Sequence, residues 1–168
     1  MDIFSECKAL YNSVFGEADP TFEDRLFEEC FNYCRYLERD GKVVSLLFLL
    51  PCKTGKENCF YLFAAATKMS ERKKGYMSKL INGILKETDT PIFLRPANDA
   101  LINYYGKLGF NLTRGTKQKN EPCIVPQAEF EALIKSFDFK ETNETYPLMY
   151  SNNKKIDFRN INFVYTME

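Results

Sequence analysis

The segment that decides the fold of this 168-residue chain lies at positions 68–80 and reads Lys68-Met69-Ser70-Glu71-Arg72-Lys73-Lys74-Gly75-Tyr76-Met77-Ser78-Lys79-Leu80. Its second half begins an apolar series with the spacing of one helix face, namely Met77, Leu80, Ile81, Ile84 and Leu85. The sequence therefore predicts an amphipathic helix that starts at or near Gly75 and is opened by a basic, glycine-containing turn.

The residues just before this turn predict a β-strand over 58–67, aromatic at first and then reduced to Ala64-Ala65-Ala66. Alanine favours helix, so three alanines at the end of a strand indicate that bulk is avoided there. Close approach of a ligand to the backbone would explain this, and so would tight packing under a helix.

A strand, a basic glycine turn and a helix start together form an anion site on physical grounds. The first-turn N–H groups of a helix lack intrahelical acceptors, and the helix dipole adds partial positive charge. Gly75 allows close approach of an anion, and Arg72, Lys73 and Lys74 add formal charge. The alternative is a set of solvated basic side chains on a surface loop. Neither a GxxxxGK[ST] nor a GxGxxG motif occurs.

Flanking segments predict the other elements. Two helices lead the chain, one over 3–14 that stops at Gly16 and one capped by Thr21. A hairpin follows, with strands 32–39 and 42–50 joined at Asp40-Gly41 and pairing ended by Pro51. Further along we expect a strand at 91–95, a helix capped by Asn98 or Asp99 and stopped by Gly109, strands at 110–119, 145–150 and 161–166, and a helix at 127–137.

Composition excludes several chemistries. The chain has no histidine, so a Ser-His-Asp triad, a Cys-His pair and an HExxH zinc site are all ruled out. The 23 basic and 23 acidic residues provide no global field for nucleic acid or a membrane surface. The six cysteines form no CxxC, no apolar run spans a bilayer, and Met1-Asp2-Ile3 lacks a basic leader. We therefore expect a cytoplasmic protein with reduced thiols and no metal, nucleic acid or membrane partner.

Two motifs carry a family resemblance. The run from Arg72 to Met77 resembles the [R/Q]-x-x-G-x-[G/A] loop of the GNAT (Gcn5-related N-acetyltransferase) superfamily, with Met77 in place of the small final residue. Asn103-Tyr104-Tyr105-Gly106-Lys107-Leu108-Gly109-Phe110 resembles that family's fYeklGF segment. The resemblance spans roughly 40–119, and the two leading helices fit the family's α1 and α2. The usual strand before α1 has no counterpart, so it is either absent or replaced by a strand from the C-terminal region.

The resemblance implies an α/β (α+β) fold: a central mixed, mostly antiparallel sheet, splayed at the family's fourth and fifth strands, with flanking helices. The chain would form one acetyltransferase domain, 1–168, with a core at 32–120 and an extension at 121–168. It would use acetyl-CoA as acetyl donor. The implied cofactor-binding residues are Phe63, Ala64, Ala65, Ala66 and Thr67 for pantetheine, Arg72, Lys73, Lys74, Gly75, Tyr76, Met77 and Ser78 for the pyrophosphate, and Asn98 for the CoA arm.

The implied chemistry is direct acetyl transfer to a primary amine, on a small molecule, a peptide N-terminus or a lysine. Tyr105 aligns with the family's general acid to the departing thiolate, although it also fits an ordinary core-facing helix stripe. The base is unassigned: ordered water is preferred over Glu57, Asp99, Glu28 or Glu29. The alternatives are a catalytically silent acyl-CoA sensor or subunit and, least favoured, an interaction domain without a cofactor. The chain is expected to be a monomer or a homodimer.

Overall fold

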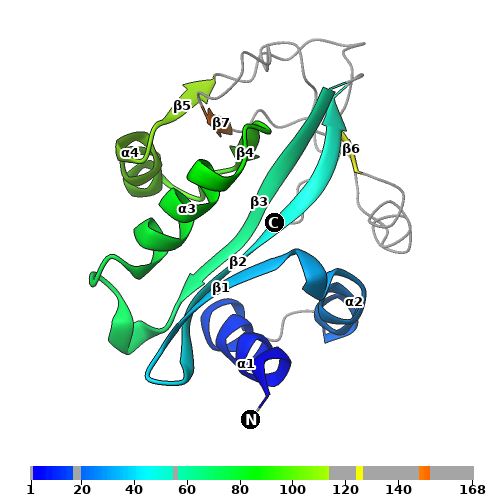
Figure 1. The fold of residues 1–168 in the computed structure, drawn as a ribbon, viewed down its shortest axis with the longest axis vertical. Coiled ribbons are helices and arrows are strands. Elements are labelled where there is room, and N and C mark those ends of the chain that lie inside the picture. Colours follow the sequence, from blue (N-terminus) through cyan, green and yellow to red (C-terminus); the bar gives the residue numbers. More distant parts are fainter. Residues whose placement is uncertain (1, 17–19, 55–56, 114–123, 127–147, 152–168) are drawn as a thin grey trace. The chain divides into compact units, whose positions relative to one another are not determined.

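The computed structural model describes residues 2–16, 20–54, 57–113, 124–126 and 148–151 (Figure 1). The helices are α1 (Ile3–Phe15), α2 (Pro20–Cys30), α3 (Tyr76–Glu87) and α4 (Asp99–Lys107), with short 3₁₀ turns η1 (Phe31–Tyr33) and η2 (Met69–Glu71). The strands are β1 (Cys34–Arg39), β2 (Lys42–Thr54), β3 (Glu57–Thr67), β4 (Ile92–Leu94), β5 (Phe110–Thr113), β6 (Ile124–Pro126) and β7 (Leu148–Ser151).

The strands form one sheet in the order β1-β2-β3-β4-β7-β5, and β6 pairs with β2. The pairs β1–β2, β2–β6, β4–β7 and β5–β7 are antiparallel, whereas β3 and β4 are parallel. The predicted fold class, a mixed and mostly antiparallel sheet with flanking helices, is thus confirmed. Among the described residues β3 pairs with β4 only at Phe60↔Ile92 and Tyr61↔Phe93, although β3 continues to Thr67.

The described chain divides into two compact units. Unit 1 consists of Met1–Leu50 and Leu62–Glu87, and unit 2 of Pro51–Tyr61 and Thr88–Glu168. The single-domain organisation expected from the sequence stays a prediction.

The β1–β2 hairpin of unit 1 turns where the sequence predicts. Asp40 and Gly41 have φ angles of 51° and 71°, the left-handed pair that a two-residue hairpin turn requires. The register then shifts between Leu37 and Glu38, so an extra residue of β2 lies in the ladder. The Glu6 carboxylate of α1 accepts the Val43 N–H at 2.9 Å, which ties α1 to β2 at this irregularity.

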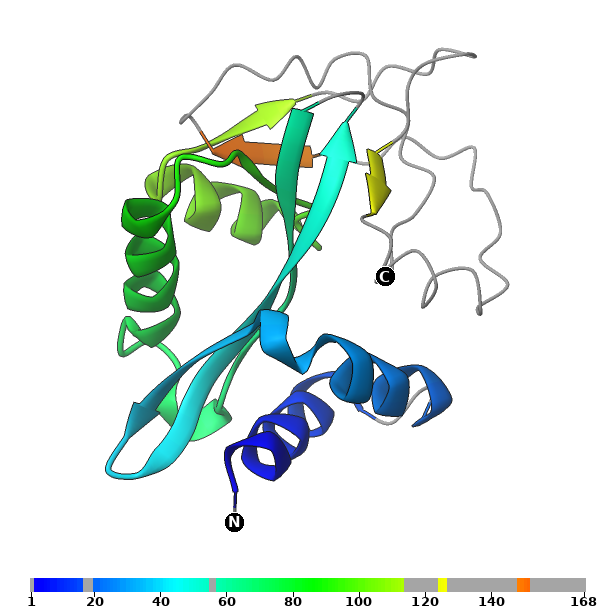
Figure 2. The same ribbon diagram turned by 45° about the vertical axis from the view of Figure 1, so that its right-hand side comes forward.

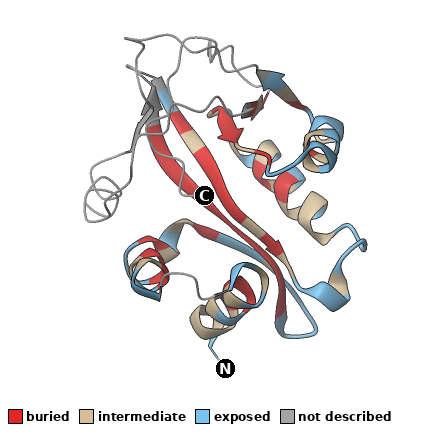
Figure 3. Cartoon of the chain, turned by 180° about the vertical axis from the view of Figure 1, so that it is seen from behind, coloured by how far each residue is buried: buried red, intermediate tan, exposed pale blue. Residues whose placement is uncertain are grey.

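The core of unit 1 lies on both sides of its strands. Helices α1 and α2 cover one face, and α3 covers the other (Figures 1 and 2). Consequently β2 is buried at every residue from Val43 to Leu50 instead of alternating (Figure 3). Phe27 of α2 is fully buried, with its ring in edge contact with those of Phe4, Tyr11 and Phe48.

Unit 2 places α4 against β5. Asn98 caps α4 by accepting the Leu101 N–H at 3.0 Å, and Gly109 adopts a φ of 95° just after the helix. The Ser151 hydroxyl accepts the Ile92 N–H at 2.9 Å and so joins β7 to β4. The cap at Asn98 and the stop at Gly109 confirm the sequence prediction for this helix.

Two predictions on element boundaries were wrong. Pro51 does not end β2, which continues to Thr54. Pairing with β1 stops at Phe48 and pairing with β6 starts at Cys52, so Pro51 lies between these two ladders. Helix α2 begins at Pro20, before the expected Thr21 cap, because proline suits the first helical position.

The C-terminal region is described only in part. Of the strand expected at 145–150, the described part is β7. The helix at 127–137 and the strand at 161–166 lie outside the described residues, as does the distal part of 110–119. Within the described part of the chain no strand precedes α1, and β6, from the C-terminal region, supplies a short strand to β2.

Candidate functional site

The basic turn of unit 1 connects β3 to α3 through η2. Lys73 and Gly75 both have left-handed backbones, with φ angles of 64° and 80°. The Lys79 N–H donates to the Gly75 carbonyl at 2.9 Å, so the intrahelical bonds of α3 begin there and the N–H groups of Tyr76 and Met77 precede them. Turns that alternate hand in this way direct successive N–H groups toward one point, which favours anion binding.

Backbone hydrogen bonds and the Arg72 side chain hold the turn to the strands. The Lys68 N–H donates to the Val44 carbonyl at 2.9 Å, and the Glu71 N–H returns to the Lys68 carbonyl at 2.8 Å. The Arg72 guanidinium donates through Nε to the Thr67 carbonyl at 3.2 Å. The position of the turn therefore follows from β2 and β3.

Space for a ligand exists at Gly75. A Cβ placed there would have no atom within 4 Å, and the residue is exposed. Neighbouring Arg72, Lys73 and Lys74 are exposed as well. An open glycine at a helix start with three adjacent cations fits a phosphate group.

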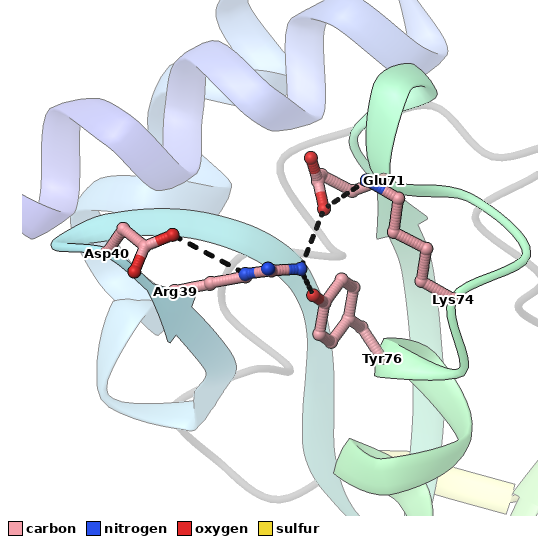
Figure 4. A network of polar contacts seen from close by, with 5 residues as sticks. All are labelled: Arg39, Asp40, Glu71, Lys74 and Tyr76. Carbon is pink, nitrogen blue, oxygen red and sulfur yellow. Dashed lines mark hydrogen bonds and ion pairs between the residues drawn. The ribbon is translucent and has the colours of Figure 1, made fainter.

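A polar network surrounds the turn (Figure 4). Glu71 binds Lys74 at 3.1 Å and lies 3.9 Å from the Arg39 guanidinium, which also donates to the Tyr76 hydroxyl. Asp40 lies 3.4 Å from Arg39 Nε. The hydrogen bond to the Tyr76 hydroxyl, and after it the Asp40 carboxylate, raises the pKa of Arg39.

The alanine run of β3 contains a residue with a left-handed backbone. Ala64 has a φ of 54°, a conformation that costs an L-residue about 1–2 kcal/mol. Tyr61, Leu62, Phe63 and Ala64 are all buried, so the usual alternation is lost here, and Ala65 is half-buried. Close packing is thus present at the alanines, while their role toward a ligand stays a prediction.

The ends of this run also have partners inside unit 1. The Phe63 ring meets the Phe22 ring of α2 edge-on at 6.4 Å. The Thr67 hydroxyl shares a hydrogen bond of 2.9 Å with Ser45 of β2. The Thr67 carbonyl is already an acceptor for Arg72. Binding of pantetheine by the backbone of residues 63–67 stays a prediction.

Asn98 and Tyr105 belong to unit 2. Asn98 is exposed and uses its side-chain oxygen as the cap of α4. Tyr105 is buried on α4, with its ring 5.9 Å from Phe110 and 5.2 Å from Tyr104. The structure therefore brings the predicted residues 63–67 and 72–78 together in one unit and places these two residues in the other.

The base candidates have ordinary surroundings. Glu28 and Asp99 are exposed, and Glu29 pairs with Arg25 at 2.6 Å. Glu57 begins β3, and its side chain lies outside the described part.

Neither metal nor thiol chemistry has an evident site in the described residues. No group of histidine, cysteine or acidic side chains there could hold a metal. The five described cysteines are buried and free, and burial raises the pKa of the Cys59 thiol to about 12. Nor is any helix in the described ranges long and apolar enough to cross a membrane.

Sequence reasoning missed Arg39, Glu71 and the left-handed residues Ala64 and Lys73. Arg39 contacts a residue 37 positions away, and the only sequence signal for this was its place beside the Asp40-Gly41 turn. Neither alanine nor lysine signals a positive φ.

Three solved structures with the same fold are distant from this chain in sequence. A Corynebacterium glutamicum protein described as histone acetyltransferase HPA2 and related acetyltransferase has a TM-score of 0.60 at 17% identity, over 92% of this chain and 93% of that one. An aminoglycoside 6′-N-acetyltransferase complexed with coenzyme A has a TM-score of 0.59 at 14% identity, over 91% and 92%. The ribosomal-protein-S18-alanine N-acetyltransferase from Escherichia coli has 0.52 at 18%, over 94% of each.

These likenesses establish the fold, and the family rests on a separate comparison of the sequence. No curated protein sequence matches the chain. The profile of the Acetyltransferase (GNAT) family, however, matches residues 3–110, which is more than half of the chain and includes both motifs and the basic turn. The chain therefore belongs to the GNAT acetyltransferase family.

Proposed function

We propose that this protein transfers the acetyl group of acetyl-CoA directly to a primary amine, on a small molecule, a peptide N-terminus or a lysine. The observation that carries the proposal is the open, left-handed Gly75 at the start of α3, beside three exposed cations, in a chain of this family. Such a turn suits a diphosphate, the group by which a CoA thioester is distinguished from simpler thioesters.

In this proposal the turn at 72–78 binds the pyrophosphate of acetyl-CoA, and β3 orients its pantetheine. Backbone N–H groups from Arg72 to Ser78 hold the pyrophosphate, and Arg72, Lys73 and Lys74 balance its charge. The backbone of Phe63 to Ala66 pairs with pantetheine, where the small alanines leave room for it. Asn98 contacts the CoA arm through its amide NH₂, because its oxygen serves the cap of α4.

Acetyl-CoA supplies the activated acetyl thioester, and the protein provides for the two proton transfers, to the departing thiolate and from the amine. Tyr105 is proposed as the acid that protonates the departing thiolate, since a phenol is a suitable donor to a basic sulfur. Ordered water is proposed to remove the proton of the amine, because β3 carries no carboxylate after Glu57 and the other acidic candidates are exposed or paired. Proximity and carbonyl polarisation contribute the remaining acceleration.

Two observations also support a silent acyl-CoA sensor: β3 has no carboxylate after Glu57, and Met77 replaces the small residue of the motif. Acetyl-CoA should raise the melting temperature under either function through mass action. Sustained release of CoA thiol with a panel of amines is expected of the enzyme and would exclude the sensor. If no acyl-CoA shifts the melting temperature at saturating concentration, both assignments fail.

A further inference from the structure

Arg39 connects the end of β1 to the basic turn. It lies outside both family motifs, yet its guanidinium donates to the Tyr76 hydroxyl and lies 3.9 Å from Glu71 (Figure 4). The same guanidinium is 5.8 Å from the centre of the Tyr76 ring. Tyr76 is the first residue of α3, so Arg39 touches the helix at its starting turn.

Glu71 extends this connection to the cations of the turn. Its carboxylate binds Lys74 at 3.1 Å and is the least exposed charged group of the network, at 20% against 52% for Arg39 and 47% for Lys74. One carboxylate therefore holds two cations that would otherwise repel each other. Lys73, which directly precedes Lys74 in the turn, is in a left-handed conformation that needs support from its surroundings.

We propose that Arg39 is a positioning residue for the cofactor turn, acting through the Tyr76 hydroxyl and Glu71 to set the start of α3 for the diphosphate of acetyl-CoA. The inference rests on the proposed function, because it assumes that the turn binds acetyl-CoA.

The planar guanidinium is central to this role. It can donate in several directions at once, to Tyr76 on one side and toward the carboxylates of Asp40 and Glu71 on the others. A lysine ammonium would keep the charge and lose this arrangement. If Arg39 served only as a distant charge that attracts phosphate, lysine would replace it fully and Tyr76→Phe would have no effect.

The test measures acetyl-CoA affinity by isothermal titration calorimetry in Arg39→Gln, Arg39→Lys, Tyr76→Phe and the double variant Arg39→Gln/Tyr76→Phe. The matched control is Arg35→Gln. Arg35 is also an exposed arginine of β1, but its guanidinium binds the carbonyls of Asn32 and Cys34 instead of the turn. Arg35→Gln therefore removes one positive charge from β1, as Arg39→Gln does.

We expect Kd to rise about fivefold in Arg39→Gln, in Arg39→Lys and in Tyr76→Phe, a size typical of an exposed charged contact. The double variant should be no weaker than either single variant, because both changes break one connection. Arg35→Gln should bind like the wild type. Additive losses, full affinity in Arg39→Lys, or an equal loss in Arg35→Gln would overturn the positioning role.

Amide hydrogen exchange without ligand separates this inference from the proposed function. Exchange of the amides at 72–78 should be faster in Arg39→Gln than in the wild type and unchanged in Arg35→Gln. If the amides at 72–78 exchange at the wild-type rate in Arg39→Gln, the inference is wrong, even where the wild-type protein binds acetyl-CoA. A wild-type protein that binds no acetyl-CoA would instead overturn the function on which the inference rests.

Discussion

Gly75→Ala distinguishes a cofactor turn from a merely basic loop. The change adds one methyl group at a φ of 80°, in a place where a Cβ would meet no atom of the protein within 4 Å. The left-handed conformation should cost an alanine about 1 kcal/mol. For a chain of this length that lowers the melting temperature of the ligand-free protein by about 3 °C.

A glycine with the same backbone provides the control. Gly41, at the hairpin turn, has a φ of 71°, and a Cβ there would also meet nothing within 4 Å. Gly41→Ala should therefore lower the melting temperature of the ligand-free protein by a similar amount. Any difference between the two variants in the presence of acetyl-CoA then reports on binding and not on strain.

The assay is thermal unfolding with acetyl-CoA at 100 times the wild-type Kd. At that concentration the ligand stabilises the wild type and Gly41→Ala by about 2.7 kcal/mol. If the added methyl weakens binding tenfold, Gly75→Ala retains only about 1.4 kcal/mol of this stabilisation. The ligand-induced shift should then be smaller by about 4 °C. Equal shifts in the two variants would refute the assignment of this turn to the pyrophosphate.

Three further outcomes are expected. Tyr105→Phe should lower kcat about 100-fold and leave the acetyl-CoA Kd unchanged, as loss of a general acid would; an unchanged kcat in steady-state thiol release contradicts that role. Phe27→Ala removes a fully buried ring and should destabilise the protein by about 3–5 kcal/mol in urea unfolding, whereas a loss below about 1 kcal/mol would mean the site collapses around the cavity. Burial raises the pKa of Cys59 from 9.0 to about 12, so the unfolded thiol ionises first; Cys59 should therefore reduce stability as pH rises from 9 toward 12, and Cys59→Ala should show a flatter pH dependence there.

Elements with a local signal could be predicted from the sequence. Helix α3 follows from apolar spacing, the hairpin from Asp40-Gly41, and the end of α4 from Gly109. In each case the residues that determine the conformation are neighbours in the chain. The basic turn belongs to this group, because glycine and three cations lie directly before the helix.

Features that depend on distant partners could not be predicted. A proline at position 51 predicts the end of a strand. In the structure β2 continues past Pro51, because β6, some 70 residues later in the chain, pairs with Cys52 to Thr54. The contact of Arg39 with Tyr76 crosses 37 positions, and the Glu6 bond to Val43 does as well. Side-chain networks of this kind leave no periodic pattern, so the residues of the turn could be located in the sequence and the network that contacts them could not.

The missing histidine and the buried cysteines together restrict how this protein could carry out acyl transfer. A covalent route needs a nucleophile activated by a base or by a lowered pKa. The chain has no imidazole, and burial raises the pKa values of Cys52 and Cys59 instead of lowering them. Direct transfer needs neither, because the attacking group belongs to the amine itself. In the proposed mechanism Tyr105 protonates the thiolate, ordered water accepts the proton of the amine, and the turn at 72–78 positions the thioester.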